Sequence, residues 1–407
     1  MADQSEQVTF AELMRRGTLE IGDGYRAKNS ELGGNGPIFM RAGRLTQSGW
    51  DWDGAERFHA ELAMKVKPKM AKPRDTVITT KGNSTGRTGY VPNDAPEFVY
   101  SPHLSYWRSK NPDELDARYL RYWALSSEFR SQLKAMAHGT DMAPYLSLSD
   151  QKRIEIVLPD VEWQRTISEV LGVLDDKIAV SERIAVTARE LGLTFYSQSL
   201  RDEDSVEVVV ESIATALTRG VTPKYTDSSD ELTVLNQKCI RGGRVNLEPS
   251  RLTLREKVKD PKLLQPNDVL VNSTGVGTLG RVARWTLDLD ATVDSHITIV
   301  RFNEDKVDPV CAGFAMLRAQ PEIEAMGEGS TGQTELRRSQ VGELELTLPS
   351  PAGQKELRPK LDALEERADQ ALRESLALAG LRDTLLPQLM SGSLRVRDAE
   401  KIVEGAV

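Results

Sequence analysis

Residues 158–200, LPDVEWQRTISEVLGVLDDKIAVSERIAVTARELGLTFYSQSL, decide the fold of this chain. Asp160 can accept hydrogen bonds from the first amide groups of a helix, and Glu162 adds a carboxylate where the helix dipole favours one. Apolar residues then recur at steps of three and four, and this periodicity predicts one long amphipathic helix whose apolar face needs a partner. These residues are Ile167, Leu171, Leu174, Ile178, Ile184, Ala188, Leu191 and Phe195.

The partner is predicted in the same chain, because residues 348–390, LPSPAGQKELRPKLDALEERADQALRESLALAGLRDTLLPQLM, repeat the first stretch 190 positions later. Gln164 recurs as Gln354, and Ser350 can cap the second helix with Pro351 at its first position. We expect Pro387 to end this helix close to Leu386, since proline lacks the amide hydrogen and clashes with the preceding turn. The second apolar stripe comprises Leu357, Leu361, Leu364, Ala368, Ala371, Leu378, Leu381 and Leu385.

The segments before the two helices, residues 9–157 and 205–347, share one plan, which indicates a two-fold duplication. Their matched positions are the turns 22–25 and 219–222, the tripeptides 73–75 and 266–268, the glycine loops 82–86 and 275–280, and His103 and His296. In the first segment we expect a turn at 21–25, strands at 38–45, 72–80, 98–107 and 153–158, a helix at 113–127 and an ordered loop at 137–147.

We therefore predict an α+β fold in which two similar mixed α/β domains are joined by two long antiparallel helices with pseudo-two-fold symmetry. The expected bounds are 1–158 for the first domain, 159–200 for the first helix, 201–348 for the second domain, 349–392 for the second helix and 393–407 for a C-terminal tail. A helix of about 37 residues spans roughly 55 Å at 1.5 Å per residue.

The composition sets outer limits on function. The 407 residues carry a net charge of −8, which argues against a general nucleic-acid coat, although residues 64–90 hold seven Lys or Arg against one Asp. Cys239 and Cys311 suggest neither a disulfide framework nor a zinc site. Residues 1–8 lack the features of a signal peptide, and no apolar run is long enough for a membrane span. We expect a cytoplasmic protein with no membrane partner.

The glycine loop at 275–280 fits the dinucleotide-binding pattern GxGxxG. That function requires a helix to open at the third glycine, whereas residues 281–285, RVARW, alternate as a strand does. A nucleotide-binding enzyme using this loop remains the alternative hypothesis. The loop also suits DNA, since glycines let the backbone approach phosphates and neighbouring hydroxyl groups can donate to them.

The order of the segments resembles the specificity subunit of Type I restriction-modification systems. The resemblance covers essentially the whole chain and rests on the two repeated helices, the sequence LLPQLMSG at 385–392 and the run PNDVLVNSTGVGTLG at 266–280. It implies two target-recognition domains that each read one half of a split site in double-stranded DNA. It also implies that two methyltransferase subunits bind the chain, and in such systems a restriction or translocase subunit can join as well.

The residues that we expect to contact DNA have polar side chains of the kinds common on protein surfaces, and they lie in the matched loops. Arg and Lys can bind guanine, Asn and Gln can bridge adenine, and hydroxyl groups can bind phosphates. A solvated side chain or a turn-stabilising amide is the alternative for each position. The candidates are Tyr25, Arg26, Lys28, Lys81, Asn83, Ser84 and Arg87 in the first domain, and Thr222, Lys224, Tyr225, Asn236, Gln237, Lys238, Arg241, Asn272, Thr274, Thr278, Arg281 and Gln333 in the second.

The sequence provides little support for catalysis by this chain. Asn111-Pro112 continues as Asp113-Glu114 and does not form the motif of exocyclic-amine methyltransferases. The four histidines, His59, His103, His138 and His296, lack metal-ligand spacing, and we expect a repeated structural hydrogen bond at His103 and His296. We therefore predict a non-catalytic chain with no cofactor or metal of its own, and the resemblance places S-adenosylmethionine in the partner methyltransferase.

Overall fold

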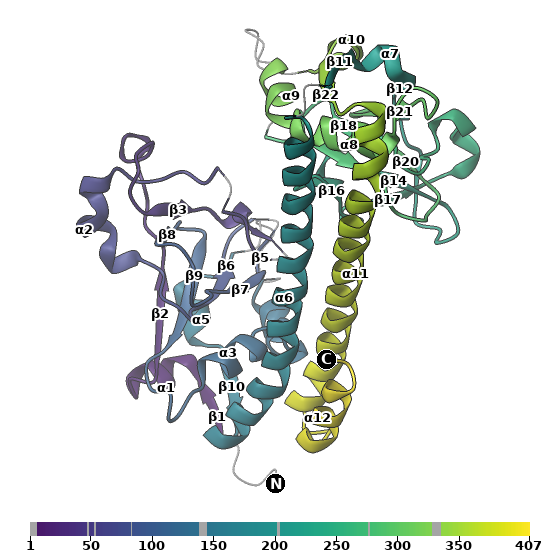
Figure 1. Cartoon of the computed structure of the whole chain (residues 1–407). Coiled ribbons are helices and arrows are strands. Elements are labelled where there is room, and N and C mark those ends of the chain that lie inside the picture. Colours follow the sequence, from purple (N-terminus) through teal and green to yellow (C-terminus); the bar gives the residue numbers. More distant parts are fainter. Residues whose placement is uncertain are drawn as a thin grey trace. The chain divides into compact units, whose positions relative to one another are not determined.

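The chain divides into two compact units (Figure 1). The computed structural model describes residues 6–46, 49–52, 54–82, 84–137, 145–201, 204–275, 277–327 and 335–407. The first unit comprises Met1–Val180 and Glu374–Val407, and the second comprises Ser181–Arg373. Each unit therefore holds one globular domain and part of each long helix, α6 (Val161–Ser199) and α11 (Pro351–Met390).

The first domain is built on a four-stranded antiparallel sheet in the order β2-β9-β6-β7. Strands β3 and β8 pair in parallel, and β1 pairs antiparallel with β10. The element bounds are β1 Glu6–Thr9, α1 Phe10–Arg15, β2 Leu19–Asp23, β3 Ile38–Met40, β4 Leu45–Thr46, β5 Gly49–Trp50, α2 Ala63–Val66, β6 Thr76–Thr79, β7 Thr88–Tyr90, β8 Phe98–Tyr100, β9 Leu104–Ser109, α3 Ala117–Trp123, α4 Ser127–Ala137, α5 Leu148–Lys152 and β10 Glu155–Leu158.

The second domain repeats this arrangement. Its four-stranded sheet has the order β12-β21-β18-β19, β14 pairs in parallel with β20, and β11 pairs antiparallel with β22. The predicted duplication is thus present in the strand pairing itself. The bounds are β11 Val206–Val209, α7 Val210–Ile213, β12 Ala214–Arg219, β13 Tyr225–Thr226, β14 Leu232–Leu235, β15 Ile240–Arg241, β16 Arg244–Val245, β17 Arg251–Thr253, β18 Val269–Asn272, β19 Val282–Arg284, β20 Ala291–Val293, β21 Ile297–Phe302, α8 Pro309–Arg318, α9 Gln320–Met326, α10 Arg338–Gly342 and β22 Glu345–Leu348.

A buried glutamine ties each long helix to the domain before it. The Oε1 of Gln164 accepts a hydrogen bond from the backbone N–H of Asp116 at 2.9 Å, and its Nε2 donates to the carbonyl of Pro159 at 2.9 Å. Gln354 makes the equivalent bond to the N–H of Asp308 at 2.9 Å. Asp116 and Asp308 in turn cap α3 and α8. The repeated glutamine therefore joins two helix starts, which explains why it recurs at the same place.

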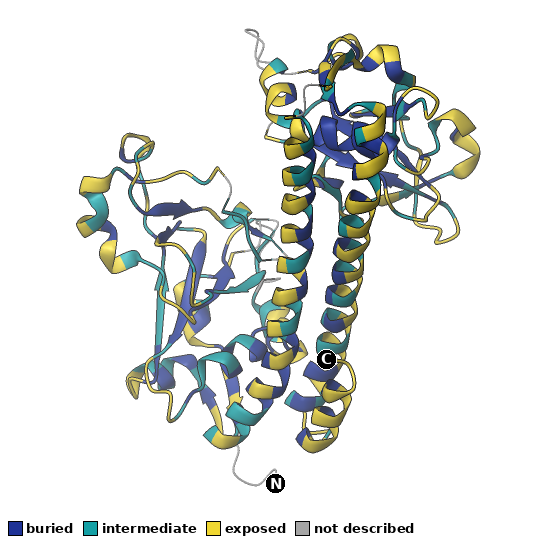
Figure 2. Cartoon of the chain, in the orientation of Figure 1, coloured by how far each residue is buried: buried dark blue, intermediate teal, exposed yellow. Residues whose placement is uncertain are grey.

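Within the first unit, the two long helices and the domain share one hydrophobic core. Leu171 and Leu174 of α6 pack in the same cluster as Leu385 of α11 and Val403 of α12 (Val396–Glu404). Asp175 accepts hydrogen bonds from Tyr122 at 2.6 Å and from Arg382 of α11 at 2.9 Å, and it forms an ion pair with Arg121 at 2.9 Å. Figure 2 shows the resulting buried stripe along both helices.

Within the second unit, small residues bring the helices together. Ala185 and Ala188 of α6 pack against Ala368 and Ala371 of α11, and all four are buried. Glu365-Glu366 lies 190 positions after Asp175-Asp176, and Glu365 forms an ion pair with Arg284 of β19, as Asp175 does with Arg121 in the first unit. None of the described helices is both long enough and apolar enough to cross a membrane.

The predicted end of the second helix at Leu386 is wrong, because α11 continues through Pro387 to Met390. Leu386 and Leu389 are 3% and 0% exposed in the core of the first unit. Burial of both leucines offsets the hydrogen bond that the proline removes. The helix ends before Gly392, whose φ of +70° is the left-handed conformation common after helix ends.

Leu191 is 40% exposed and does not lie on the buried stripe of α6. The buried face passes through Ala188 and Tyr196 instead, and Gly192 lies between them close to Phe314 and Leu361. The prediction assigned Leu191 to the apolar stripe because it is strongly apolar, but its neighbour Gly192 occupies the buried face instead.

Several local predictions in the first domain need correction. Strand β2 continues to Asp23, so the turn begins after that residue. The strand expected at 72–80 begins only at Thr76, because Arg74 has a φ of +70°. The strand expected at 38–45 stops at Met40. The strand expected at 98–107 is two strands, β8 and β9, and the helix expected at 113–127 is confined to α3.

Helix α4 was not predicted, whereas β10 lies inside the range expected for the last strand. Residues 138–144 of the expected loop lie outside the described residues.

Candidate nucleic-acid interface

In the second domain, the candidate residues lie at one end of the sheet β12-β21-β18-β19. The loop after β18 meets the loop before β21, since the N–H of Ser273 donates to the carbonyl of His296 at 2.8 Å. Arg219, at the end of β12, donates to the carbonyl of Leu336 at 2.6 Å. We name this surface, made of residues 219–225, 236–241, 273–275, 277–281, 294–296 and 335–336, the loop end of the second domain.

The first domain has an equivalent loop end, made of residues 23–28, 42–45, 80–82, 84–87, 101–103 and 145–146. The N–H of Thr80 donates to the carbonyl of His103 at 2.9 Å, as Ser273 does to His296. The matched turns also agree. A Cβ atom on Gly24 would lie 2.1 Å from the carbonyl oxygen of Ser101, and one on Gly220 would lie 2.1 Å from that of Val293. Both turns thus require glycine for the same close approach between backbones.

The glycine loop of the second domain is a hairpin between β18 and β19. The N–H of Gly280 donates to the carbonyl of Asn272 at 2.8 Å, and Gly275, Gly277 and Gly280 all have positive φ. In the first domain, the N–H of Gly86 donates to the carbonyl of Thr79 at 2.8 Å in the same way. Strand β19 begins at Val282, two residues after Gly280, and pairs antiparallel with β18. The helix that a dinucleotide site needs is therefore absent from this position.

Asn272, one of the predicted base-reading residues, lies inside the second domain. Its side chain is fully buried, and its Nδ2 donates to the carbonyls of Gln237 and Thr278 at 2.9 and 3.0 Å. This amide therefore holds the glycine loop against the neighbouring turn. Asn236 has a similar role, since its Nδ2 donates to the carbonyl of Pro249 at 2.5 Å and its Oδ1 accepts from the N–H of Lys238.

A chain of polar side chains crosses the loop end of the second domain. The Nε2 of Gln237 donates to Thr274 Oγ1 at 2.7 Å, and that hydroxyl lies 2.8 Å from Nδ1 of His296. His296 is exposed, so this chain reaches the surface. Asp294 lies below it, and burial raises the pKa of its carboxyl above the usual value. The three side chains can present donors and acceptors together to a base edge or a phosphate.

The remaining candidates of the second domain are distributed around this chain. Lys238, Arg241, Thr222 and Lys224 are exposed, as is Tyr225, whose ring lies 3.5 Å from the guanidinium carbon of Arg251. Thr278 is half-buried, with its hydroxyl 3.4 Å from the carbonyl of Gly275. Arg281 is half-buried and donates to the carbonyl of Gly277 at 2.8 Å. Gln333 lies outside the described residues.

In the first domain, Arg26, Lys28 and Lys81 are exposed. Tyr25 is half-buried and donates from its hydroxyl to Glu31 at 3.0 Å. The carbonyl of Ser84 accepts from the N–H of Arg87 at 2.9 Å, and Nη1 of Arg87 donates to the carbonyl of Leu45 at 2.7 Å. Arg87 and Arg281 therefore both bond to backbone carbonyls. Asn83 lies outside the described residues.

One pair of matched residues was missed by the sequence analysis. Lys69 donates to the carbonyl of Asp23 at 3.1 Å, and Lys262 donates to the carbonyl of Arg219, the equivalent position in the second domain. Both lysines end a 3₁₀ turn with proline, Lys67–Lys69 and Asp260–Lys262. Burial lowers the pKa of Lys262, and the positive charge of Arg338 lowers it to a smaller extent. The repeated pattern Val-Lys-Pro-Lys and Val-Lys-Asp-Pro-Lys was the available signal.

A second missed pair fixes the sheet beneath each loop end. The carboxylate of Asp75, just before β6, accepts hydrogen bonds from Nε and Nη2 of Arg108 at 2.6 Å each. The carboxylate of Asp268, just before β18, accepts hydrogen bonds from Nε and Nη2 of Arg301 at 2.8 and 2.7 Å. Both carboxylates are almost fully buried. Each central strand is thus joined to its neighbour by a bidentate ion pair.

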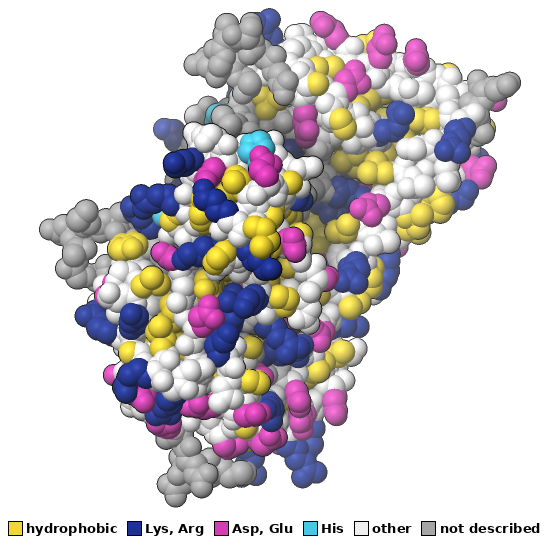
Figure 3. All heavy atoms as spheres, turned by 90° about the vertical axis from the view of Figure 1, so that its left-hand side faces the viewer, with side chains coloured by type: hydrophobic (Ala, Val, Ile, Leu, Met, Phe, Trp, Pro, Cys, Tyr) yellow, Lys and Arg dark blue, Asp and Glu magenta, His cyan; other side chains and the backbone are white. Residues whose placement is uncertain are grey.

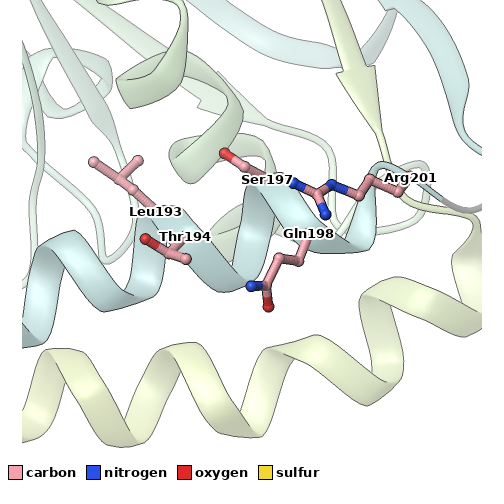
Figure 4. Close-up of a pocket in the computed structure, with 5 residues that line it drawn as sticks. All are labelled: Leu193, Thr194, Ser197, Gln198 and Arg201. Carbon is pink, nitrogen blue, oxygen red and sulfur yellow. The ribbon is translucent and has the colours of Figure 1, made fainter.

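No group of three or more His, Cys, Asp or Glu able to hold a metal ion occurs among the described residues. Figure 4 shows a cavity of about 260 Å³ that is lined by Leu193, Thr194, Ser197, Gln198 and Arg201, at the end of α6. A second cavity, of about 280 Å³, lies in the first domain beside residues 35–37 and Arg57. The glycine loop lines neither of them.

Residues 19–187 match the family model described as the Type I restriction modification DNA specificity domain. The matched residues make up less than half of the chain, and over them the chain is similar to this family. The match includes every candidate residue of the first domain, from Tyr25 to Arg87, and extends into α6. None of the curated proteins compared with the chain matches it significantly.

One solved structure extends the similarity in fold to the whole chain. The S subunit of a Type-I restriction-modification system from M. genitalium is 16% identical with a TM-score of 0.50, and the match covers 96% of this chain and 97% of that one. The HsdS subunit from Thermoanaerobacter tengcongensis is 13% identical with a TM-score of 0.38, covering 97% and 98%. A structure described as showing complex assembly and conformational transition of the type I R-M system is 14% identical with a TM-score of 0.39, covering 97% and 99%.

Proposed function

We propose that this chain is the DNA-reading subunit of a Type I restriction-modification complex and that each domain reads one half of a split site in double-stranded DNA. The observation that carries the proposal is the duplicated loop end. The same backbone scaffold presents different side chains in the two domains, with Arg26, Lys28 and Lys81 in the first and Lys238, Arg241 and the Gln237–Thr274–His296 chain in the second.

We propose that the long helices set the gap between the two half-sites. Helices α6 and α11 contain 39 and 40 residues. At 1.5 Å per residue each is roughly 60 Å long. Two short readers joined by rigid helices combine two weak recognition events into one specific site. The proposed domain bounds are those given above: 1–158 and 201–348 for the readers, 159–200 and 349–392 for the helices and 393–407 for the tail.

The chemistry on DNA is proposed to belong to partner chains. Two methyltransferase subunits that carry S-adenosylmethionine would bind this chain, and restriction subunits would join them in complexes that cleave DNA. The chain itself would then contribute recognition and assembly and no catalytic group. Such a complex would act on chromosomal and invading DNA in the cytoplasm.

Mapping of modified bases in cellular DNA, with and without the gene, tests the proposal. We expect a methylated motif of two short halves around a fixed gap, which disappears on deletion of the gene. Replacing residues 205–347 by those of a related chain should change one half of the motif and leave the other half and the gap intact. A change in both halves, or a contiguous motif, would contradict the assignment of one half-site to each domain.

A further inference from the structure

The first domain carries a projecting element whose side chains differ from those of its counterpart in the second domain. We name residues 60–74 the basic arm; it contains the 3₁₀ helices Ala60–Leu62 and Lys67–Lys69 and helix α2 between them. It holds five Lys or Arg against one Glu. Met64 is 75% exposed, and Lys67, Lys72 and Arg74 are exposed as well. An apolar side chain therefore stands among cations.

The basic arm is anchored on the turn that holds the candidate residues. Lys65 pairs with Glu31 at 2.7 Å, and the hydroxyl of Tyr25 donates to the same carboxylate at 3.0 Å. Lys69 pairs with Asp23 at 2.5 Å. These ion pairs attach the arm to the residues on either side of Arg26 and Lys28 in the sequence.

The apolar side of the arm strengthens this attachment. Val66 is fully buried in a cluster with Phe39, Phe58 and Val99. Figure 3 views the first domain from the side that carries α2, and Lys and Arg side chains gather there around hydrophobic ones. Met64 is thus presented by a fixed helix, and its exposure does not come from a loose loop.

The second domain provides an internal comparison. Val258 is buried as Val66 is, and Lys262 repeats the bond of Lys69, so Glu256 stands at the position of Met64. Glu256 pairs with Lys257 at 2.9 Å. The residue matched to Met64 is therefore a charged side chain, so the second domain offers no apolar group to a base step at this position.

We propose that the basic arm binds the DNA duplex beside the first half-site, with Lys67, Lys72 and Arg74 on phosphates and Met64 against the base pairs in the minor groove. This inference rests on the proposed function and adds to it an asymmetric contact made by one domain only. Methionine is among the apolar side chains that proteins insert at base steps, and flanking cations are needed to bring such a side chain to the groove. Three exposed cations on one short arm, Lys67, Lys72 and Arg74, favour a polyanion over an apolar protein groove as the occupant.

The test uses the full chain with its methyltransferase subunits and a duplex that contains the motif, with 2-aminopurine placed in turn at the base steps around the first half-site. The variants are Met64→Ala, Met64→Glu and Lys67→Ala, and Ile402→Ala, at an exposed apolar residue of α12, is the control. We expect Met64→Ala to weaken binding about tenfold at an unchanged salt slope and to abolish an increase in fluorescence at one step. Lys67→Ala should reduce the slope of log K against log salt by about 0.9.

Binding and fluorescence of both Met64 variants equal to those of the wild type would overturn the proposal. So would a loss of methyltransferase co-purification with Met64→Glu at unchanged DNA affinity, since that result would make the arm a protein-docking surface. The arm variants should keep the second half of the methylated motif. A wild-type chain that selects no split motif would instead refute the proposed function, and the two failures are therefore distinguishable.

Discussion

The ion pair between Asp75 and Arg108 allows a quantitative prediction for Arg108→Met. Asp75 is fully buried and accepts four hydrogen bonds, two from Arg108 at 2.6 Å, one from the hydroxyl of Tyr100 at 2.8 Å and one from the N–H of Lys72 at 2.9 Å. The substitution leaves a buried carboxylate without its cation. We expect it to lower the free energy of unfolding of the first unit by about 3–5 kcal/mol.

The double variant Asp75→Asn with Arg108→Met separates the cost of the stranded charge from that of lost packing. A neutral amide needs no cation, so the double variant should be more stable than Arg108→Met by at least about 1 kcal/mol. Urea unfolding followed by tryptophan fluorescence is a suitable assay. Five of the six tryptophans lie in the first unit, and Trp285 is the exception.

Arg301→Met is the matched control, because it breaks the equivalent pair with Asp268 in the second unit. It should leave the main fluorescence transition in place. If Arg108→Met costs less than about 1 kcal/mol, or if adding Asp75→Asn destabilises the unit further, the buried charge is not the source of the stabilisation.

Three further predictions concern the junctions, the turns and the arm. Gln354→Ala should lower the stability of the second unit by about 1–3 kcal/mol, because it strands the N–H of Asp308, and thermal unfolding measures this; equal stability would refute the role of the glutamine. Gly220→Ala should change or abolish the second half of the methylated motif and spare the first, since its Cβ would lie 2.1 Å from the carbonyl oxygen of Val293; an unchanged motif would show that the turn adjusts freely. The hydrogen bond from Lys65 holds the pKa of Glu31 at about 2, below the ordinary 4.5. The contribution of this ion pair to the stability of the arm is complete above about pH 4.5 and is lost as the pH falls towards 2, so the ratio of pepsin cleavage within residues 60–74 in the wild type to that in Glu31→Gln at the same pH should rise towards 1 over that window.

The long helices and the duplication were predictable because their signals are short-range and repeated. Asp160 caps α6 through the N–H of Trp163 at 2.9 Å, and Ser350 receives the N–H of Gly353 at 3.3 Å, as the residue types indicate. The glycine loops were also predictable as hairpins, because the alternation after Gly280 belongs to a strand.

The contacts within the loop ends could not be predicted in the same way. Lys69 bonds to a carbonyl 46 residues away, and no local pattern encodes that distance. Residue type also does not report burial, so Asn272 and exposed Lys238 were equal candidates before the structure placed them. Pro387 shows the same limit for helices, since the leucines beside it gain more from the core than the helix loses at the proline.

The division of the chain into units has a consequence for its synthesis. The core of the first unit contains Leu378, Leu385 and Val403, whereas the second unit consists of one continuous segment, Ser181–Arg373. During translation the second unit can therefore complete its core while the first still waits for the last part of α11 and for α12. The domain that is synthesised first is therefore the one that finishes folding last. Until residues near 403 leave the ribosome, Leu171 and Leu174 lack the residues of α11 and α12 that bury them in the native core.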